Sequence, residues 1–485
     1  MKSILIHRFT KLIGLVALLT FINTCSRNPV TGKKQVMFMS EAQEQALGDQ
    51  SDPQIITEYG EFKDARLQTF IDQKGQEMAA ISHRNKLTYK FRILDSPVIN
   101  AFALPGGYVY FTRGILAHFN NEAELAGVLG HEIGHITARH SASQATKQTL
   151  ASIFLIGGMI LVPQVAEFAE ELSQGVGLLF LKFSRDNESQ SDQLGVDYST
   201  KIGYDAHHMA NFFKTLGRLS DQGGARIPTF LSTHPDPGDR YVQVNKLADE
   251  AQKKTPGAKL VGRDSYLAML EGLVYGEDPR QGYVENQVFY HPEMLFQFPI
   301  PNEWKTVNSP SQVQMAPTDG KALLLLTLSS GKSLEEAAQL ATQNYKLTVQ
   351  GQERSSVNGL SALVMRSEQI NQQDPNATVR VLSYFISYNN LIYEFHGVST
   401  KTEFTRYELL LLNTMRGFRK LTDQSKIQVT PDLITLKKVD RQATLKDLFV
   451  NWRIPEKRHE ELAIVNSMLL TEVVPSGTII KAIKK

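Results

Sequence analysis

The stretch VLGHEIGHITARH, residues 128–140, decides the fold of the first half of this chain. It holds His131, Glu132 and His135 at the spacing H-E-x-x-H. With 12 His among 485 residues, chance would produce this spacing only about 0.015 times in such a chain. Two histidines four residues apart lie about 40° apart around a helix, so both imidazoles can face one metal ion. The stretch therefore predicts a metal site on a helix.

The residues around the motif predict that helix. Asn121 can serve as its N-cap, Glu124 stands three residues later as in a capping box, and no proline interrupts the segment before His140. On one continuous helix His140 would lie about 140° around the axis from His135, so we interpret His140 as structural. Three glycines within 127–134 destabilise a helix interior by up to about 1 kcal/mol each, which predicts a second helix packed very close to this one.

A downstream segment, residues 181–205, can supply that second helix and a third metal ligand. A catalytic zinc site usually has three protein ligands and one open position. Ser184 is a candidate N-cap, and Glu188 and Asp192 lie four residues apart on one side of the helix. Glu188 is the candidate third ligand, and Asp192 a candidate acceptor for the outer N–H of a zinc-bound histidine. The alternative, a solvated acidic helix face, is disfavoured by the H-E-x-x-H motif in the same region.

Length and composition describe an ordinary globular protein of two or three domains. The net charge is +2, and the basic tail IKAIKK is the only Lys-rich or Arg-rich block, so nucleic acid is not an expected partner.

The N-terminus has the pattern of a secretory signal over residues 1–24. A basic start precedes an apolar run over 12–22 that is too short to span a membrane comfortably. Cys25, the only cysteine, follows directly and is a candidate lipidation site, although Asn23 and Thr24 depart from the small residues usual there. A plainly cleaved signal and an uncleaved anchor are the alternatives. A second apolar stretch, residues 149–166, is interpreted as buried helices that cover the motif helix, and less favourably as a membrane hairpin.

Five ordered segments resemble zinc metallopeptidase family 48, which includes the HtpX, CAAX prenyl protease and periplasmic BepA-like enzymes. The resemblance runs from about Cys25 to Asp249 and departs at Ser191, where relatives usually have Ala. The segments are CSRNPVTGKKQ (25–35), NAFALPGGYVYFTRGIL (100–116), HEIGHITARHS (131–141), FSRDNESQSDQLGVDY (183–198) and LSTHPDPGDR (231–240).

The resemblance implies a mainly helical, gluzincin-type protease domain that binds one Zn²⁺ per chain. Its ligands would be His131, His135 and Glu188, with Glu132 as the general base that accepts a proton from the zinc-bound water. Because both histidines must be neutral to bind zinc, activity is expected to fall in acid.

Two further segments are candidates for the cleft. Residues 100–104 and 108–112 predict two strands, and in similar enzymes the strand with Asn100 and Ala101 borders the cleft, where an extended substrate could pair with its edge. A hairpin that only packs under the helix is the alternative. His234 is expected to be either a transition-state donor or an inhibitory fourth ligand. Arg240 is expected to stabilise the oxyanion or to tie its loop to an acid.

The predicted fold class is α+β, with domains at 25–255 (metallopeptidase), 256–425 (connector and α+β accessory domain) and 426–485 (small C-terminal module). Strand-like runs surround helical patterns at 333–345 and 402–417 in the accessory domain. The C-terminal module follows a strand, helix, helix, strand order and faintly resembles a LysM-like module, which would imply contact with peptidoglycan.

These features together predict a zinc metalloendopeptidase of the periplasm, tethered by lipid at Cys25 to the outer membrane. Its partners would be unfolded or misassembled envelope proteins. Two alternatives stay open: an envelope chaperone or assembly factor with a silent or plugged zinc site, and a peptidoglycan-binding protein with a vestigial protease domain.

Overall fold

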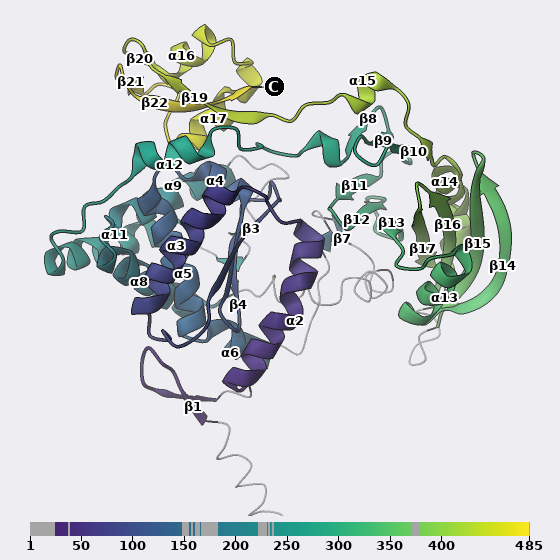
Figure 1. The fold of residues 1–485 in the computed structure, drawn as a ribbon, viewed down its shortest axis with the longest axis horizontal. Helices are drawn as coiled ribbons and strands as arrows, with labels where there is room; N and C mark the ends of the chain where they lie inside the picture. Colours follow the sequence, from purple (N-terminus) through teal and green to yellow (C-terminus); the bar gives the residue numbers. More distant parts are fainter. Residues whose placement is uncertain are drawn as a thin grey trace, which may run out of the picture.

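The structure is a computed structural model that describes most of the chain in three parts (Figure 1). The described residues are 25–36, 39–147, 155–156, 159–160, 165, 183–221, 230, 233–234, 237–370 and 378–484. The predicted signal peptide, residues 1–24, and most of the apolar stretch 149–166 lie outside them. Within that stretch, β6 (Leu155–Ile156) and β7 (Met159–Ile160) pair as antiparallel strands, so the prediction of helices is wrong for these residues.

The first part, here called the helical domain, surrounds the H-E-x-x-H helix α5 (Glu122–Thr137). Its N-terminal hairpin is formed by β1 (Cys25–Arg27) and β2 (Lys34–Val36). The other helices are α2 (Glu41–Tyr59), α3 (Ala65–Ile81), α4 (Arg113–His118), α6 (His140–Lys147), α8 (Arg185–Lys201), α9 (His207–Asp221), α11 (Pro237–Lys254) and α12 (Arg263–Leu270). No helix in the described part of the chain is both long enough and apolar enough to cross a membrane.

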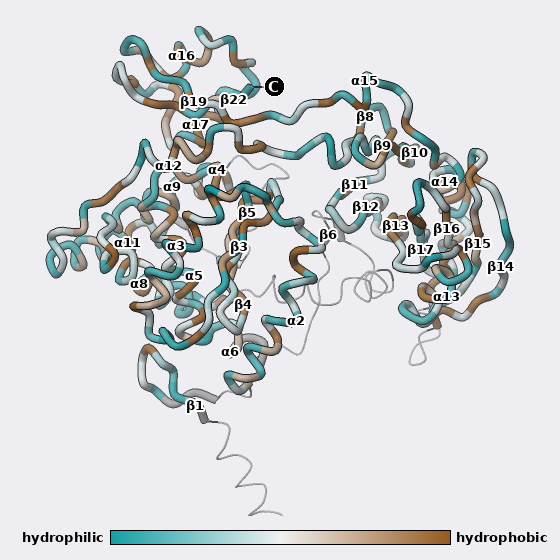
Figure 2. The backbone as a smooth tube through the Cα atoms, in the orientation of Figure 1, coloured by the Kyte–Doolittle hydropathy of each residue, from teal (hydrophilic) through white to brown (hydrophobic). Residues whose placement is uncertain are grey.

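A three-stranded sheet lies beside α5 in the order β3, β5, β4. Strand β3 (Lys90–Leu94) runs parallel to β5 (Tyr108–Thr112), and β4 (Ala101–Leu104) pairs with β5 antiparallel. The strands predicted over 100–104 and 108–112 are confirmed, and β4 forms the edge of the sheet. Figure 2 shows hydrophobic colouring on these strands. Every residue of β4 and β5 is buried, which fits that colouring.

Close packing of α5 against α8 explains the glycines of the motif helix. A Cβ atom at Gly130 would lie 3.0 Å from the carbonyl oxygen of Gly195, and one at Gly134 would lie 3.2 Å from Cβ of Leu194. A Cβ at Gly127 would meet Cβ of Met209 on α9 at 2.4 Å. The predicted close neighbour of α5 is therefore confirmed, and it is the helix that carries Glu188.

The motif helix starts as predicted but ends earlier. Asn121 is the N-cap and accepts a hydrogen bond from the Glu124 backbone N–H, while the Glu124 carboxylate accepts one from Asn120 N. Helix α5 stops at Thr137, and Arg139 adopts a left-handed conformation with φ 59°. The expected continuous helix through His140 is therefore wrong. His140 begins the separate helix α6, and an angle measured on the α5 wheel does not apply to it.

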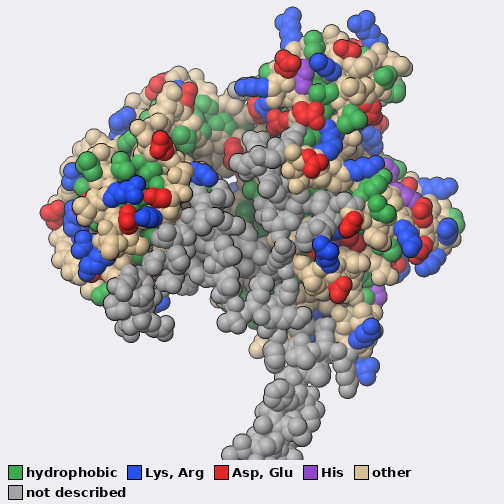
Figure 3. Space-filling view, turned by 180° about the vertical axis from the view of Figure 1, so that it is seen from behind, with side chains coloured by type: hydrophobic (Ala, Val, Ile, Leu, Met, Phe, Trp, Pro, Cys, Tyr) green, Lys and Arg blue, Asp and Glu red, His purple; other side chains and the backbone are tan. Residues whose placement is uncertain are grey.

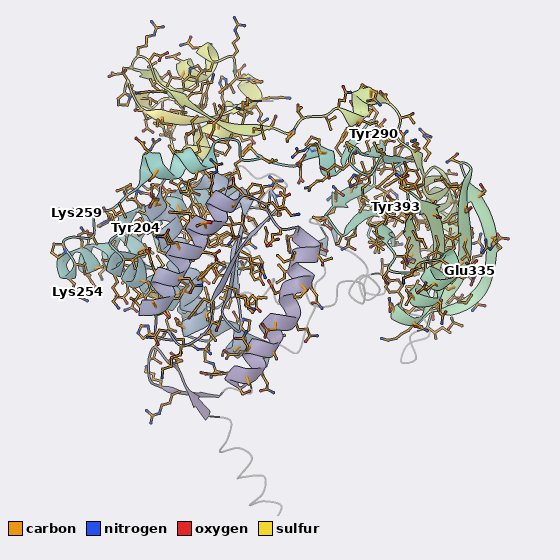
Figure 4. All side chains as sticks on the ribbon, viewed as in Figure 1. Tyr204, Lys254, Lys259, Tyr290, Glu335 and Tyr393 are labelled. Atoms are coloured by element: carbon orange, nitrogen blue, oxygen red, sulfur yellow. The ribbon has the colours of Figure 1, made fainter. Side chains whose placement is uncertain are left out.

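The second part, here called the sheet domain, contains both strands and helices. Its seven-stranded antiparallel sheet has the order β11, β12, β13, β17, β16, β15, β14. Apolar residues of α13 pack on one face of the sheet and those of α14 on the other. In Figure 4, Tyr393 of β17 is labelled, and its ring lies 5.1 Å from that of Phe296 on β10. The elements are β8 (Tyr283–Glu285), β9 (Val288–His291), β10 (Phe296–Pro299), β11 (Lys305–Asn308), β12 (Gln312–Ala316), β13 (Ala322–Leu328), α13 (Leu334–Asn344), β14 (Thr348–Val357), β15 (Leu360–Gln369), β16 (Val379–Tyr388), β17 (Leu391–Thr400), α14 (Phe404–Arg416), β18 (Arg419–Lys420) and α15 (Gln424–Ile427).

The third part, the C-terminal module, is anchored on the helical domain. Lys481 is fully buried, and its Nζ donates to the carbonyl oxygens of Ala117 and Phe119, each at 2.9 Å. Ser467 Oγ accepts a hydrogen bond from Asn120 Nδ2 at 2.8 Å. The predicted order of strand, helix, helix, strand is present, with the further short strands β20 before the helices and β21 after them. The elements are β19 (Leu433–Lys438), β20 (Ala443–Thr444), α16 (Leu445–Asn451), α17 (His459–Val465), β21 (Val473–Val474) and β22 (Ile479–Lys484).

The sheet domain is connected to the helical domain by two adjacent chain segments. Gly272 N donates to Ile434 O, and Ile434 N donates to Leu273 O, so the outgoing and returning segments form a short antiparallel ribbon. A bridge between Val274 and Leu433 extends the ribbon. In Figure 1 these segments run above the helical domain toward the sheet domain. The chain thus leaves the helical domain to form the sheet domain and then returns to the same place to form the C-terminal module.

Candidate metal centre

Four buried side chains converge where α5, α8 and the segment before α11 meet. His131, His135, Glu188 and His234 each bring one nitrogen or oxygen atom within 4.8 Å of all the others. His131 Nε2 lies 3.0 Å from His135 Nε2 and 3.3 Å from His234 Nδ1. Glu188 Oε1 lies 2.9 Å from His234 Nδ1 and 3.4 Å from His135 Nε2. The structure thus brings the three predicted ligands together and adds His234 as a fourth group.

These separations fit a zinc ion. Zinc bonds of about 2.1 Å in tetrahedral geometry place neighbouring ligand atoms about 3.4 Å apart. The four measured separations lie between 2.9 and 3.4 Å. Imidazole nitrogens and a carboxylate oxygen are also the donor types that zinc prefers. The donor set and its spacing therefore match one tetrahedral zinc ion.

Asp192 and Arg240 contact the ligand side chains from outside the metal centre. His131 Nδ1 lies 2.9 Å from Asp192 Oδ1, which is where the predicted outer acceptor should lie. Arg240 donates to both oxygens of Asp192, at 2.8 and 2.6 Å, and its Nη1 lies 2.8 Å from Glu188 Oε2. Its guanidinium also covers the ring of Phe213, with 4.3 Å between Cζ and the ring centre. Arg240 therefore holds its helix against two acids of α8.

Glu132 lies beside the four ligand groups and is fully buried. Among the described residues, neither of its carboxylate oxygens has a hydrogen-bond partner, and the nearest charged group is His234 Nε2, 3.7 Å from Oε1. Burial raises the pKa of this carboxyl group. An unpaired buried carboxylate is costly, so Glu132 has the environment of a proton acceptor rather than of a structural residue.

Burial and neighbouring charges set the protonation of the ligand groups. Burial holds the pKa of His135 well below its usual value, which keeps the imidazole neutral and able to bind a metal. Burial alone would raise the pKa of Glu188, but His234 and Arg240 outweigh it and the pKa is well below the usual value. Burial likewise opposes the effect of Glu188 and Glu132 on His234, whose pKa is nevertheless raised.

Three contacts of the ligand histidines were missed by the sequence reasoning. The Phe183 ring centre lies 4.0 Å from that of His135, and the Phe230 ring stacks on His234 at 4.4 Å. His140 Nδ1 lies 3.1 Å from His135 Nδ1, although His140 was set aside as a structural residue. No residue type in the sequence predicts the His140 contact, because it depends on the left-handed turn at Arg139.

The edge strand β4 offers main-chain groups beside α5. The Asn100 carbonyl accepts a hydrogen bond from Thr112 N at 3.1 Å, so the Asn100 backbone is engaged with β5. Because main-chain groups alternate in direction along a strand, those of Ala101 point away from β5. On the same side of the strand, Ile99 O accepts a hydrogen bond from Phe230 N and Ala103 O accepts one from Ser141 Oγ. The Asn100 side chain is buried, and its Oδ1 has no hydrogen-bond partner among the described residues.

Residues 65–248 match the model of peptidase family M48. The chain is also similar to the mitochondrial metalloendopeptidase OMA1 of Arabidopsis thaliana, with 35% identity over 158 residues, 32% of this chain and 31% of that protein. The beta-barrel assembly-enhancing protease of Yersinia pestis is 31% identical over 262 residues, 52% of each chain. The chain thus spans about half or less of these two relatives. Among solved structures, the cyanobacterial PsbP protein of Synechocystis matches 28% of this chain and 91% of that one, with 14% identity and a TM-score of 0.24.

Proposed function

Because residues 65–248 belong to peptidase family M48, we propose that this protein is a zinc-dependent endopeptidase that hydrolyses unfolded or misassembled proteins. The observation that carries the proposal is the convergence of His131, His135 and Glu188 beside the Glu132 carboxylate, which has no hydrogen-bond partner in the part of the chain that the structure describes. A structural zinc site needs no general base beside it. The arrangement therefore favours hydrolysis over a purely structural metal.

Each residue of the centre has a distinct part in this proposal. His131, His135 and Glu188 would hold the zinc ion, which would lower the pKa of a water molecule toward about 7 when bound. Glu132 would accept a proton from the attacking water molecule and pass it to the leaving amine. Asp192 fixes the orientation of His131 through the 2.9 Å contact, and Arg240 fixes Asp192.

The substrate is proposed to bind as an extended strand along β4. Main-chain groups at Ala101 point away from β5, so a substrate strand could pair with them once Phe230 and Ser141 give up their contacts with the flanking carbonyls. Hydrogen bonds between backbones do not depend on side-chain identity. Asn100 is buried, and its backbone bonds to β5, so we expect Asn100 to support the strand. Ala101 is then the residue that contacts the substrate. Broad sequence specificity follows from such binding and suits substrates that are unfolded.

His234 is proposed to be an inhibitory fourth ligand. Its Nδ1 lies within 3.3 Å of both His131 Nε2 and Glu188 Oε1, so it would take the ligand position that a catalytic zinc site leaves to water. A transition-state donor would instead lie outside that position. This position also favours the second candidate function, an assembly factor whose zinc site is plugged.

The cellular setting is proposed from the N-terminus and the relatives. The name of the Yersinia pestis relative describes a protease that enhances β-barrel assembly, and a signal peptide at 1–24 with lipid on Cys25 would bring this chain to the same envelope. The partners are then envelope proteins, with an outer-membrane anchor through lipid. Contact of the C-terminal module with peptidoglycan stays a prediction.

The deciding experiment compares the purified protein with Glu132→Gln for cleavage of unfolded casein. Both proteins are first shown to bind about one zinc per chain, because Gln keeps the shape of the side chain and removes the base. Cleavage by the unmodified protein alone supports the proposal. Cleavage by both, with zinc bound, would contradict the role of Glu132.

A matched control comes from the same helix. Glu122 also lies on α5, where its carboxylate accepts hydrogen bonds from Tyr204 and Ser265, away from the metal centre. Glu122→Gln should keep casein cleavage. Equal loss in both variants would mean that the assay reports damage to α5 rather than loss of a base.

A further inference from the structure

The two ring nitrogens of His135 face different neighbours. Nε2 lies 3.0 Å from His131 Nε2 and 3.4 Å from Glu188 Oε1, inside the metal centre. Nδ1 lies on the other side of the ring, 3.1 Å from Nδ1 of His140. A neutral imidazole that offers the Nε2 lone pair carries its proton on Nδ1, and that N–H needs an acceptor in a buried site.

His140 meets the requirements of that acceptor. Its Nε2 lies 2.9 Å from Oε1 of Gln190. An amide oxygen can only accept, so this contact holds the proton of His140 on Nε2 and leaves a lone pair on Nδ1. That lone pair points to His135. Ser191 Oγ lies 3.2 Å from the same nitrogen.

The local fold is built to bring His140 to this place. The left-handed turn at Arg139 ends α5 and redirects the chain, so that the first residue of α6 folds back toward His135. His140 is only 3% exposed. Gln190 lies on α8, between Glu188 and Asp192, so the helix that supplies a ligand also holds the far side of His140.

We propose that His140 is a positioning residue of the metal centre, which accepts a hydrogen bond from His135 and fixes the tautomer that presents Nε2 to the zinc ion. It does for His135 what Asp192 does for His131. This inference rests on the proposed function, because it assigns a part to His140 only if the centre binds zinc.

The test uses three substitutions of His140 that separate the effect of its Nδ1 from the effect of its Nε2. In His140→Asn the amide oxygen can take the place of Nδ1, in His140→Gln the amide group takes the place of Nε2, and His140→Phe removes both. Zinc affinity is measured by competition with a chromophoric chelator, and cobalt is substituted for zinc so that the absorption spectrum reports the ligand geometry. Neither readout depends on proteolysis.

The expected result separates Asn from the other two variants. His140→Asn should bind zinc within about threefold of the unmodified protein, whereas His140→Gln and His140→Phe should bind about 10 to 100 times more weakly with an altered cobalt spectrum. Equal affinity in all variants, or equal loss in Asn and Phe, would overturn the proposal. If His140→Phe does not fold, the comparison of Asn with Gln decides alone.

Two further measurements keep the outcomes distinct. His118 on α4 is also a buried histidine, and its Nδ1 lies 2.7 Å from the Gly114 carbonyl oxygen. His118→Phe should lower the melting temperature without changing zinc affinity, which separates loss of stability from loss of metal positioning. If the unmodified protein itself binds no zinc, the proposed function fails first. If it binds zinc and the His140 variants all match it, only the role of His140 fails.

Discussion

Two buried clusters in this protein combine histidine with carboxylate, and they differ in how their polar atoms are paired. One is the metal centre of the helical domain. The other lies in the sheet domain, where Ser383 Oγ is 2.9 Å from His396 Nδ1 and His396 Nε2 is 3.2 Å from Glu394 Oε2. By residue type alone, the second cluster has the composition of a Ser-His-acid hydrolase and is as deeply buried as the first.

The pairing of the atoms distinguishes the two clusters. In the metal centre, neither oxygen of Glu132 nor Nε2 of His234 has a hydrogen-bond partner among the described residues. In the sheet domain, the side chains of Ser383, His396 and Glu394 form one chain of contacts, and rings of Tyr345 and Phe385 lie against His396. A buried group without a partner indicates that something else binds there, while a fully paired network indicates structural support.

On the face drawn in Figure 3, the described basic and acidic side chains are interspersed, in keeping with a net charge of +2. The comparison therefore rests on the buried polar groups, and each of the following variants tests whether the two clusters differ as their pairing indicates.

The largest contrast is expected between Glu188→Gln and Glu394→Gln. Loss of a supporting group beside a ligand already weakens metal binding by about 10 to 100 times, so loss of the Glu188 ligand should cost more than about 100-fold in zinc affinity and abolish cleavage. Glu394→Gln should leave both unchanged and lower the free energy of unfolding by about 1 to 3 kcal/mol. Zinc titration and urea unfolding of both variants check this. Weaker zinc binding in Glu394→Gln would contradict the distinction between the metal centre and the cluster of the sheet domain.

A smaller effect is expected for Asp192→Asn. The amide keeps the shape of the side chain but offers Arg240 only one oxygen in place of two, and it weakens the hold on His131. Zinc affinity should fall about tenfold, the lower end for groups that orient a ligand. Chelator competition at fixed pH measures it. Unchanged affinity would mean that Asp192 serves only to anchor Arg240.

His234→Ala should act in the opposite direction. Removal of the imidazole frees the ligand position beside His131 and Glu188 that His234 Nδ1 would otherwise take. Basal casein cleavage should therefore rise severalfold while zinc affinity falls. Initial rates at saturating zinc compare the variant with the unmodified protein. Unchanged cleavage would remove the inhibitory role, and abolished cleavage would favour His234 as a transition-state donor.

The sequence predicted the local part of the metal centre and missed what depends on turns and distant contacts. The N-cap at Asn121 and the contact of α5 with the helix of Glu188 follow from residue type and spacing, and both are confirmed. The contact of His140 with His135 was missed because a non-glycine residue, Arg139, adopts the left-handed conformation, which residue type rarely predicts. The burial of Lys481 against α4 joins segments more than 360 residues apart, which no local pattern contains.

The cluster in the sheet domain could not have been recognised from the sequence for a similar reason. Ser383 and His396 lie opposite each other on β16 and β17, and only the register of the two strands brings them into contact. Each strand also holds other polar residues, such as Ser387 on β16 and Ser399 on β17, so neither strand alone identifies the pair that meets.

The smallest expected effect is that of Ser383→Ala, and it tests whether the fully paired cluster is inert. Ser383 is fully buried at the centre of the sheet, and its hydroxyl contacts His396 Nδ1. Loss of this hydrogen bond should lower the free energy of unfolding by about 1 kcal/mol, because one neutral hydrogen bond contributes about that much. Casein cleavage and zinc affinity should not change. A serine-directed fluorophosphonate should leave Ser383 of the unmodified protein unlabelled, as it must in the Ala variant. Labelling of Ser383 in the folded protein would mean that this network is accessible and reactive, and that complete pairing of buried polar atoms does not separate structural clusters from catalytic ones in this chain.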